Sequence, residues 1–537
     1  MNVDTEPLSG RPWPTYRSLP ERLNMTAEVL DRQVQDGYGQ RPALIHEGGV
    51  VSYAALYQRV STLAASLKRL GIERGSRVVI RMANSADFAV SFLAVVKLGA
   101  IPVLVNSLLA AADLKAIVIE TEPRWVITES SRADAVREVR AESRIDAVIC
   151  AAGAAHNELA LEELLTGTAA VVEAADTAAN DPAFMVCTSG TTGKPKGIVH
   201  AHRWIATLGD LNRYRLPPLE NDVVMATGEW SFISALGHNL LFALRNGVTG
   251  AILAGRVTPE NVLTAIEKYR VTVLYSVATV YRRLLASPDF EQRYDLSSLR
   301  CAHSTGEALR EATYHEWKNR ARSELYEHYG VSEYQLVIGH GIRHPVKPGS
   351  VGKILPGVGA AILDDEFRAV RQGDLGQLAI ARTDPGLFLG YYGDSERTEA
   401  MMRSGWYVTG DLAYQDEEGY VFIAGRRDDC FKSRGIFISP AEIENALQKH
   451  PAVVEAAVIP VPDGVIGNKI RAVVVLRDRQ TASDELAQSL RQSLRAQIAP
   501  YKVPHDIDFA DSLPKSPVGK ILRARLIARH KDRPVKA

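Results

Sequence analysis

Residues Thr188–Gly197 read TSGTTGKPKG, and this stretch carries the strongest chemical signal in the sequence. Glycines let backbone N–H groups approach the oxygen atoms of a ligand, hydroxyls donate hydrogen bonds, and lysines offset negative charge. The composition therefore predicts a loop that wraps the phosphates of a nucleotide. The residues expected to do so are Thr188, Ser189, Gly190, Thr191, Thr192, Gly193, Lys194 and Lys196.

The loop is not a Walker P-loop, although it has a similar composition. That motif requires glycine where Thr188 stands and Ser or Thr after Lys194, where the sequence has Pro195. The chain also has no G-x-S-x-G nucleophile elbow, so a serine hydrolase is unsupported.

Helix-type and strand-type patterns alternate along the first part of the chain. Ser52 can cap a helix whose apolar residues recur at helical spacing until Gly71. Short apolar runs between such helices are typical of parallel strands, so we expect an α/β fold with a large N-terminal domain of several subdomains. The predicted segments are strands at Arg77–Met82, Ile101–Val105, Arg124–Thr128, Ala147–Cys150 and Val271–Val277, and a helix at Asp87–Leu98.

The pattern changes after Gly425, where the short polar run GRRDD interrupts the chain. Beyond it the sequence predicts a small, compact α+β domain. We therefore divide the chain into residues 1–425 and 426–537. The predicted elements of the second domain are helices at Pro440–Lys449 and Glu485–Ile498 and strands at Val453–Ile459 and Arg471–Leu476.

Length and charge exclude several classes of protein. The 537 residues exceed the roughly 250–300 at which a single core stops growing. The 63 basic side chains balance 63 acidic ones, which leaves no basic stripe for nucleic acid. The longest apolar stretch, Phe88–Val105, is interrupted by Lys97 and Pro102, so we expect no integral membrane segment. The four cysteines are scattered, which favours reduced thiols in a cytoplasmic protein.

Further motifs follow the loop in a fixed order, and with it they resemble the adenylate-forming superfamily. This superfamily includes acyl- and aryl-CoA synthetases, nonribosomal-peptide adenylation domains and luciferases. The resemblance covers nearly the whole chain. The motifs are STGEAL (Ser304–Leu309), YEHYGVSE (Tyr326–Glu333), WYVTGD (Trp406–Asp411), GRRDD (Gly425–Asp429), FKSRGIFISPAEIE (Phe431–Glu444) and PKSPVGK, which ends at Lys520.

The resemblance implies a nucleotide site built from distant segments. Glu333 would hold Mg²⁺, which needs only one or two carboxylates when it bridges phosphates. The other implied contacts are Gly306, Glu307, Tyr329 and Gly330 at the adenine, Ser332 at the α-phosphate, Asp411 at the ribose, and Arg426 at the ribose or a phosphate.

The resemblance also implies two half-reactions. Lys520 would bridge the substrate carboxylate and the α-phosphate of ATP, so that acyl-AMP and pyrophosphate form. Asp428 would be the hinge on which the small domain turns, and Arg434 with Gly435 would then admit coenzyme A, whose thiol displaces AMP. ATP, Mg²⁺ and coenzyme A are thus the implied cofactors. The implied catalytic residues are Lys520, Glu333, Lys196 and Thr188.

A small carboxylic acid is the implied substrate. The segment ATGEWSFISALGH is aromatic and mostly neutral, which suits a flat aromatic or an aliphatic acid, although Trp230 and Phe232 fit core packing equally well. Glu229 is a hypothetical contact for an amine or hydroxyl on the ring. The residues implied at the acid are Trp230, Phe232, Gly237, His238, Ala278, Ser304, Thr305 and Gly330.

We favour a benzoate-like acid, because the first and last segments of the chain resemble benzoate- and aminobenzoate-CoA ligases. The segment KPGSVGK (Lys347–Lys353) also resembles medium-chain acyl-CoA synthetases, so a medium-chain or branched acid is one alternative. An acyl-AMP ligase that loads a carrier protein is another. A nucleotide-binding regulator with a dead site would require loss of Lys520, Glu333 or Asp411, and all three are present. The sequence leaves open whether the protein is a homodimer.

Overall fold

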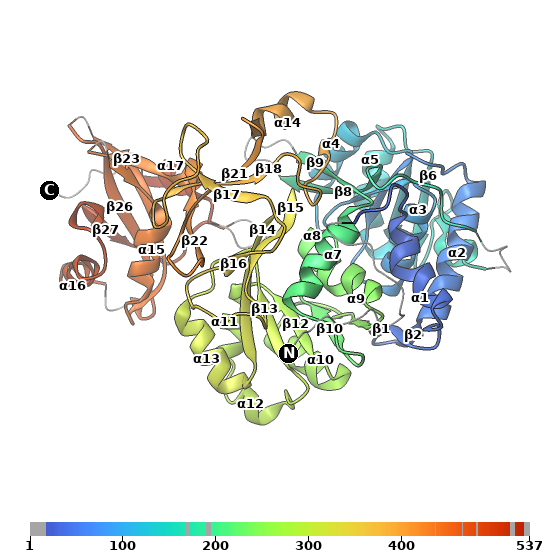
Figure 1. The fold of residues 1–537 in the computed structure, drawn as a ribbon, viewed down its shortest axis with the longest axis horizontal. Coiled ribbons are helices and arrows are strands. Elements are labelled where there is room, and N and C mark those ends of the chain that lie inside the picture. The colour runs from blue at the N-terminus through green and yellow to red at the C-terminus, as the bar shows by residue number, and fades with distance from the viewer. Residues whose placement is uncertain are drawn as a thin grey trace. The chain divides into compact units, whose positions relative to one another are not determined.

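The computed structural model describes residues 18–166, 172–189, 195–434, 436–463, 465–479, 482–515 and 521–530 (Figure 1). The chain divides into two compact units. The first comprises Met1–Ala360 and Ile380–Tyr407, and the second comprises Ala361–Ala379 and Val408–Ala537. The predicted α/β class with a larger first part and a smaller second part is confirmed, whereas the domain boundary at Gly425 and the mobility of the second part stay predictions.

One sheet of the first unit has eight strands in the order β19-β9-β8-β4-β3-β5-β6-β7. Its strands from β8 to β7 run parallel, and β9 and β19 are antiparallel to their neighbours. The strands are β3 (Arg77–Arg81), β4 (Ile101–Leu104), β5 (Trp125–Glu129), β6 (Ala147–Ala151), β7 (Leu159–Ala160), β8 (Pro182–Ser189), β9 (Pro195–Ala201) and β19 (Gly390–Tyr391).

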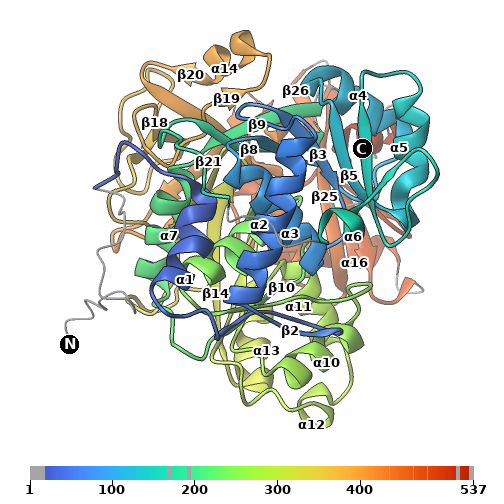
Figure 2. The same ribbon diagram turned by 90° about the vertical axis from the view of Figure 1, so that its right-hand side faces the viewer.

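Helices α2 (Tyr53–Arg69) and α3 (Ala86–Lys97) pack against each other, as Figure 2 shows. The Ser52 hydroxyl accepts a hydrogen bond from the Ala55 N–H at 3.2 Å, which is the predicted cap of α2. Ser85 caps α3 in the same way through the Phe88 N–H. Both helices and the strands predicted around them are therefore confirmed to within two residues.

A second sheet of the first unit has nine strands in the order β16-β15-β14-β13-β12-β10-β11-β1-β2. The strands from β14 to β1 are parallel, and the sheet ends in antiparallel hairpins on both sides. The strands are β1 (Pro42–His46), β2 (Gly49–Ser52), β10 (Val223–Ala226), β11 (Thr249–Ala251), β12 (Val273–Ser276), β13 (Cys301–Ser304), β14 (Glu324–Val331), β15 (Tyr334–Gly339) and β16 (Lys353–Ile354).

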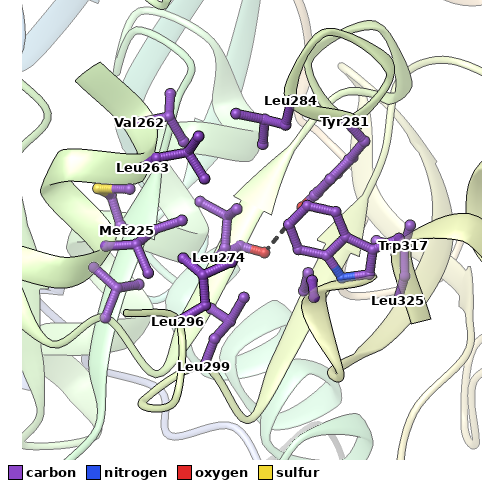
Figure 3. Packing of buried hydrophobic residues seen from close by; sticks show 14 of the residues in the cluster. Met225, Val262, Leu263, Leu274, Tyr281, Leu284, Leu296, Leu299, Trp317 and Leu325 are labelled. Carbon is purple, nitrogen blue, oxygen red and sulfur yellow. Dashed lines mark hydrogen bonds between the residues drawn. The ribbon is translucent and has the colours of Figure 1, made fainter. Parts of the chain in front are cut away.

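Helices α10 (Pro259–Tyr269), α11 (Ala278–Leu285) and α13 (Glu311–Ala321) pack on this sheet through a hydrophobic core. Figure 3 shows Tyr281 and Trp317 beside Leu274 in that core. The two rings meet edge to face with their centroids 4.9 Å apart, an arrangement that aromatic pairs favour. This core supports the strands whose carboxyl ends carry the predicted site.

The first unit contains further helical segments. They are η1 (Ala27–Asp31), α1 (Arg32–Gln35), α4 (Ala111–Thr121), η2 (Ser130–Arg132), α5 (Ala133–Arg140), α6 (Leu161–Leu164), α7 (Trp204–Arg215), α8 (Ile233–Ala235), η3 (Leu236–Leu241), α9 (Phe242–Arg245), α12 (Phe290–Arg293) and α14 (Ser395–Met401).

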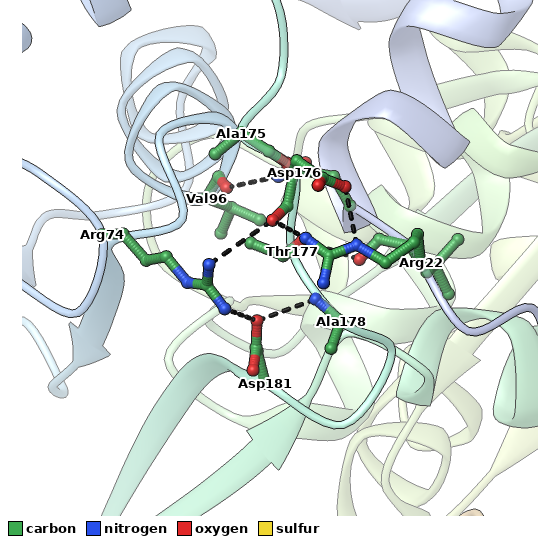
Figure 4. A network of polar contacts seen from close by, with 10 residues as sticks. Arg22, Arg74, Val96, Ala175, Asp176, Thr177, Ala178 and Asp181 are labelled. Atoms are coloured by element: carbon green, nitrogen blue, oxygen red, sulfur yellow. Dashed lines mark hydrogen bonds and ion pairs between the residues drawn. The ribbon is translucent and has the colours of Figure 1, made fainter.

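The first described residues are fixed to the unit by polar contacts. Arg22 pairs with Asp176, and Arg74 donates to both Asp176 and Asp181 (Figure 4). Deeper inside, the fully buried Lys97 ammonium lies 2.5 Å from Asp31 Oδ2. Because a buried ammonium needs a counter-charge, η1 is tied to the end of α3.

The second unit is built around two small sheets of its own. Strands β23 (Phe431–Ser433) and β24 (Ile436–Ile438) form a hairpin, and β25, β26 and β27 form a three-stranded sheet. The predicted helices and strands here are confirmed, although β25 and β26 are longer than expected. The elements are α15 (Pro440–Gln448), β25 (Val453–Asp463), β26 (Gly467–Leu476), α16 (Asp484–Arg495), η6 (Pro500–Lys502), β27 (Asp506–Phe509) and α17 (Arg523–His530).

The chain passes between the units at three points, inside β17, β18 and β21, and all three strands belong to a five-stranded sheet. Its order is β17-β18-β21-β20, with β22 paired to β21. The 3-10 turn η4 (Arg427–Asp429) follows β22. The strands are β17 (Ala360–Leu363), β18 (Gly376–Ala381), β20 (Met402–Arg403), β21 (Trp406–Gln415) and β22 (Val421–Arg426). No helix in the described part of the chain is long and apolar enough to cross a membrane.

Candidate active site

Glu333 lies in the tight turn between the antiparallel strands β14 and β15. Gly330 has to be glycine here, because a Cβ atom on it would lie 1.7 Å from the carbonyl oxygen of Gln335. The hairpin can therefore close only with glycine at this position. This close approach places the motif YEHYGVSE on a strand and turn, with its acidic residue at the tip.

The Glu333 carboxylate is buried and carries its own counter-ion. Lys196 Nζ on β9 lies 2.7 Å from Glu333 Oε1, and the Tyr391 hydroxyl on β19 donates to the same oxygen at 2.7 Å. Burial alone would raise the pKa of Glu333, but the charge and hydrogen bond of Lys196 and the hydrogen bond from Tyr391 outweigh it and hold the pKa below its usual value. Glu333 is therefore ionised at neutral pH.

Two further contacts fix the backbone of this turn. His200 on β9 has its Nε2 atom 3.0 Å from the carbonyl oxygen of Ser332. Since a carbonyl only accepts, Nε2 carries the proton, and burial lowers the pKa of His200 to about 3, so the ring is neutral. The Phe388 N–H donates to the carbonyl oxygen of Glu333 at 3.0 Å. Neither His200 nor Phe388 was among the predicted residues.

Tyr391 was also missed, because 58 residues separate it from Glu333 and no spacing in the sequence connects them. The Lys196 ammonium lies 4.9 Å from the centre of the Tyr391 ring, a favourable cation–π distance. Burial and the neighbouring Glu333 raise the pKa of Tyr391 far above its ordinary value. The side chain is thus a neutral donor that binds the carboxylate without adding charge.

The predicted adenine turn is fixed at both of its ends. It begins after β13, and Gly306 adopts a φ of +82°, which favours glycine. The Glu307 carboxylate accepts hydrogen bonds from the N–H and hydroxyl of Thr279, at 3.0 and 2.7 Å, at the start of α11. At the other end, the Leu309 N–H donates to Glu327 Oε1 at 2.9 Å, and burial raises the pKa of Glu327 to about 8. The turn therefore has little freedom to move.

The residues predicted at the acid lie around the carboxyl ends of β12 and β13, where ligands bind in open parallel sheets. Ala278 opens α11 after β12, and Thr305 donates its N–H to the carbonyl oxygen of Ser276 at 3.2 Å. Ser304 is the last residue of β13, and its buried hydroxyl has no partner among the described residues. Such a hydroxyl is available to a ligand.

Trp230 and Phe232 differ in their surroundings. The Trp230 ring is fully buried, meets the Phe88 ring edge to face and donates its Nε1–H to Asn239 Oδ1 at 2.9 Å. It packs in the core, so a contact with the acid stays a prediction. Phe232 is 39% exposed and can meet a ligand without rearrangement of the core.

Gly237 and His238 lie in the π-helical segment η3. A Cβ atom on Gly237 would lie 2.6 Å from the amide group of Gln335, so η3 and β15 approach closely at this glycine. The His238 ring stacks on Tyr275 at 4.1 Å, and its Nε2 lies 3.1 Å from Nε2 of His328. His238 is fully buried, and its pKa lies well below the usual value because of burial and the charge of Arg215. It is a neutral side chain beneath the predicted acid site.

The residues predicted at the ribose belong to the second unit. Asp411 on β21 pairs in register with Arg426 on β22, and the Arg426 guanidinium lies 3.4 Å from Asp411 Oδ1. A Cβ atom on Gly410 would lie 2.9 Å from that guanidinium, so glycine lets it approach. Asp428 lies in η4, directly after this pair. These positions are compatible with the predicted ribose contact and hinge, which stay predictions.

The chain was compared with known proteins. Residues 14–392 match the family described as AMP-binding enzyme, and residues 442–520 match the AMP-binding enzyme C-terminal domain. The chain belongs to the AMP-binding enzymes. The predicted family is thereby confirmed.

Relatives of this AMP-binding enzyme match it over nearly their whole length. An acyl-CoA ligase of Bacillus subtilis is 34% identical over 92% of this chain and 94% of its own. Benzoate-CoA ligase of Thauera aromatica is 31% identical over 96% and 97%, and an acetyl-coenzyme A synthetase of Bacillus subtilis is 30% identical over 94% and 90%. The crystal structure of the anthranilate CoA ligase AuaEII in complex with anthranoyl-AMP has 30% identity and a TM-score of 0.88, over 96% of this chain and 99% of that one.

Several predicted residues of the AMP-binding enzyme lie outside the described residues. Thr188 and Ser189 are described only as the last residues of β8, without their side chains, and Arg434 is described with a left-handed φ of +52°. Glycine and asparagine favour that conformation, so an arginine there marks a strained backbone next to the predicted coenzyme A contact. The residues outside the described ranges are Gly190, Thr191, Thr192, Gly193, Lys194, Gly435 and Lys520.

The side chains around Glu333 fit the Mg²⁺ ion that this family uses with ATP. Within the described ranges, no three His, Cys, Asp or Glu side chains are grouped to hold a metal ion. A protein cage for the ion is therefore absent from these ranges, but Mg²⁺ bound together with a nucleotide needs only one or two carboxylates. Glu333 is a buried, ionised carboxylate and meets that need.

The Glu229 side chain joins two loop segments through hydrogen bonds. Its carboxylate accepts hydrogen bonds from the N–H and hydroxyl of Ser107, at 3.2 and 2.8 Å, and from Ser231 at 3.3 Å. These bonds tie the segment after β4 to the segment before α8. A contact with an amine on the substrate stays a hypothesis, and it would compete with these three donors.

Proposed function

We propose that this enzyme activates an aromatic, benzoate-like carboxylic acid. It is an AMP-forming acid–thiol ligase, which converts a carboxylic acid to its acyl-adenylate with ATP and Mg²⁺ and transfers the acyl group to coenzyme A. The likeness to an anthranilate CoA ligase over almost the full length of both chains carries the aromatic assignment. The benzoate-CoA ligase relative supports it as well.

The roles of the site residues are part of this proposal. In the first half-reaction the substrate carboxylate attacks the α-phosphate of ATP and pyrophosphate leaves, which requires positioning and positive charge. Lys196, Thr188 and the following loop bind the phosphates, and Lys520 bridges the two reacting groups. When bound, Mg²⁺ on Glu333 supplies further positive charge at the phosphates.

The geometry of the first unit supports the placement of the adenine and the acid. The turn at Gly306 and Glu307 is held rigidly between α11 and β14, so it offers the adenine a preformed edge. Ser304 directs an unpartnered hydroxyl from the carboxyl end of β13. Asp411 and Arg426 bind the ribose, Asp428 is the hinge, and Arg434 with Gly435 admits coenzyme A in the second half-reaction.

The decisive experiment is carboxylate-dependent release of pyrophosphate, measured with and without coenzyme A. The panel contains benzoate, aminobenzoates, hydroxybenzoates and fatty acids from C2 to C12. We expect turnover of one aromatic acid at least tenfold above the fatty acids in kcat/KM, with formation of the matching thioester. A preference for a fatty acid would overturn the aromatic assignment.

A medium-chain or branched acid is the second candidate, and the acetyl-coenzyme A synthetase among the relatives is the observation that favours an aliphatic substrate. Loading of a carrier protein is the third, and release of pyrophosphate without a thioester would point to it.

We also propose a cytoplasmic location, which the four free cysteines support. Light scattering would distinguish a homodimer from a monomer.

A further inference from the structure

The contact between Lys196 and Glu333 has a consequence for the order in which ligands bind. Glu333 is 4% exposed, and the described residue that neutralises its charge is Lys196, at 2.7 Å from Oε1. A buried carboxylate without a counter-charge is strongly unfavourable. A lysine that we expect at the phosphates therefore neutralises the carboxylate that is expected to hold the metal.

Lys196 and a divalent cation would compete to neutralise this carboxylate. An ammonium group at hydrogen-bond distance and an Mg²⁺ ion on the same group would lie within a few ångströms of each other, where like charges repel strongly. Lys196 is a flexible side chain with three donors and is partly exposed, so it can move to another anion. The phosphates of the nucleotide are such an anion.

Tyr391 can keep its place during this exchange. Its hydroxyl is a neutral donor to Glu333 Oε1, and it enters from β19, which pairs with β9 at Ile198, two residues after Lys196. A neutral phenol does not repel a cation. With Tyr391 on Oε1, the Glu333 carboxylate would keep its orientation when Mg²⁺ takes the place of Lys196.

We propose that Lys196 is the resident counter-ion of Glu333 and exchanges with Mg²⁺ only when the triphosphate accepts its ammonium group, while Tyr391 is a positioning residue that holds the carboxylate throughout. This inference rests on the proposed assignment of Glu333 as the metal ligand. It makes binding of the metal and of the nucleotide mutually dependent, since each strengthens the other by the same factor.

The exchange can be measured without turnover. Mn²⁺, a paramagnetic substitute for Mg²⁺, is titrated into the whole enzyme at pH 8 and followed by electron paramagnetic resonance, with and without an ATP analogue that has a methylene group between the α- and β-phosphates. We expect the analogue to tighten Mn²⁺ binding to the wild type beyond the affinity of the free analogue, by a coupling of about 5- to 150-fold.

Two substitutions at residue 196 separate charge from packing. Lys196→Gln removes the counter-ion, and we expect it to bind Mn²⁺ without nucleotide at least about fivefold more tightly than the wild type. Lys196→Arg keeps the positive charge and is expected to behave as the wild type. Unchanged nucleotide-free binding in folded Lys196→Gln would overturn the proposal. If that variant does not fold, a wild-type enzyme that binds Mn²⁺ equally well with and without the analogue would overturn it.

Tyr391→Phe tests the positioning role. We expect a severalfold higher KM for Mg²⁺ and weaker Mn²⁺ binding with the analogue, with little change in the affinity for the analogue alone. Equal Mn²⁺ affinities in this variant and the wild type would exclude that role.

Glu333→Gln serves a separate purpose. If it binds Mn²⁺ with the analogue as the wild type does, Glu333 is not the metal ligand, and the assignment under the proposed function fails. If it loses that binding while Lys196→Gln shows no gain, only the counter-ion inference fails.

Discussion

His200 on β9 donates its Nε2–H to the carbonyl oxygen of Ser332 at 3.0 Å, which joins the strand after the proposed phosphate loop to the turn that carries Glu333. We expect His200→Phe to raise the KM for Mg²⁺-ATP and to lower kcat/KM about tenfold, since a lost hydrogen bond is worth about 1 kcal/mol and the turn loses its register as well. Steady-state pyrophosphate release measures this. His200→Gln, which keeps an N–H donor, should retain most of the activity, and equal losses in both variants would contradict the explanation.

Asp411→Asn keeps the shape of the side chain and removes its charge. We expect kcat/KM for ATP to fall about 10- to 100-fold, because hydrogen bonds to charged groups are worth about 1.5–3 kcal/mol. Asp416, which follows the same strand and accepts hydrogen bonds from the N–H groups of Glu418 and Tyr420, offers a control, and Asp416→Asn should leave the KM for ATP unchanged. A normal KM for ATP in Asp411→Asn would rule out a ribose contact.

Gly330→Ala should open the hairpin between β14 and β15. The added Cβ would lie 1.7 Å from the Gln335 carbonyl oxygen, so the backbone has to shift and the melting temperature should fall by several degrees, with loss of adenylation. Gly393→Ala is a matched control, since a Cβ there meets no atom within 4 Å and only its positive φ opposes alanine, at a cost of about 1 kcal/mol. If the two variants melt alike, the hairpin contact is not as tight as described.

The buried carboxyl group of Glu327 should make the stability of the protein depend on pH. Burial raises its pKa to about 8 in the folded protein, so between the unfolded value near 4.5 and pH 8 the folded state binds the extra proton. Stability contributed by this group is therefore fully present below about pH 4.5 and is lost as the pH rises toward 8. In Glu327→Gln, the side-chain amide oxygen can still accept the hydrogen bond from the Leu309 N–H, and the side chain has no carboxyl proton to lose. It should melt higher than the wild type at pH 8.5 and similarly at pH 5; a parallel pH profile for both proteins would refute the shifted pKa.

The fold was predictable where the signal is local. The spacing of apolar residues and the Ser52 cap define α2, and the buried runs define β3 to β6, because both patterns act within a few residues. The helices and strands after Pro440 followed from the same reasoning, with β25 extending past the prediction. There the strand continues through Pro460 and Pro462. Proline is disfavoured in strands, but both residues pair with β26 in this sheet.

The contacts inside the site were not predictable from spacing. Lys196, Glu333 and Tyr391 come from three distant segments. The pairing of β9 with β19, the hairpin at Gly330 and the contacts of its turn with His200 and Phe388 bring them together. The resemblance named two of the three, but not their mutual contact. Trp230 shows the converse, since an aromatic residue in a suggestive motif turned out to be fully buried in the core.

The buried pair of Lys97 and Asp31 bears on how the protein can be trimmed for use as a biocatalyst. A version that begins after Asp31 would leave an ammonium group in the interior with no anion beside it. The Lys97 ammonium would then have to lose its proton, or water would have to enter the interior beside α3. Shortening at the amino end should therefore stop before η1, and fusion partners belong ahead of it.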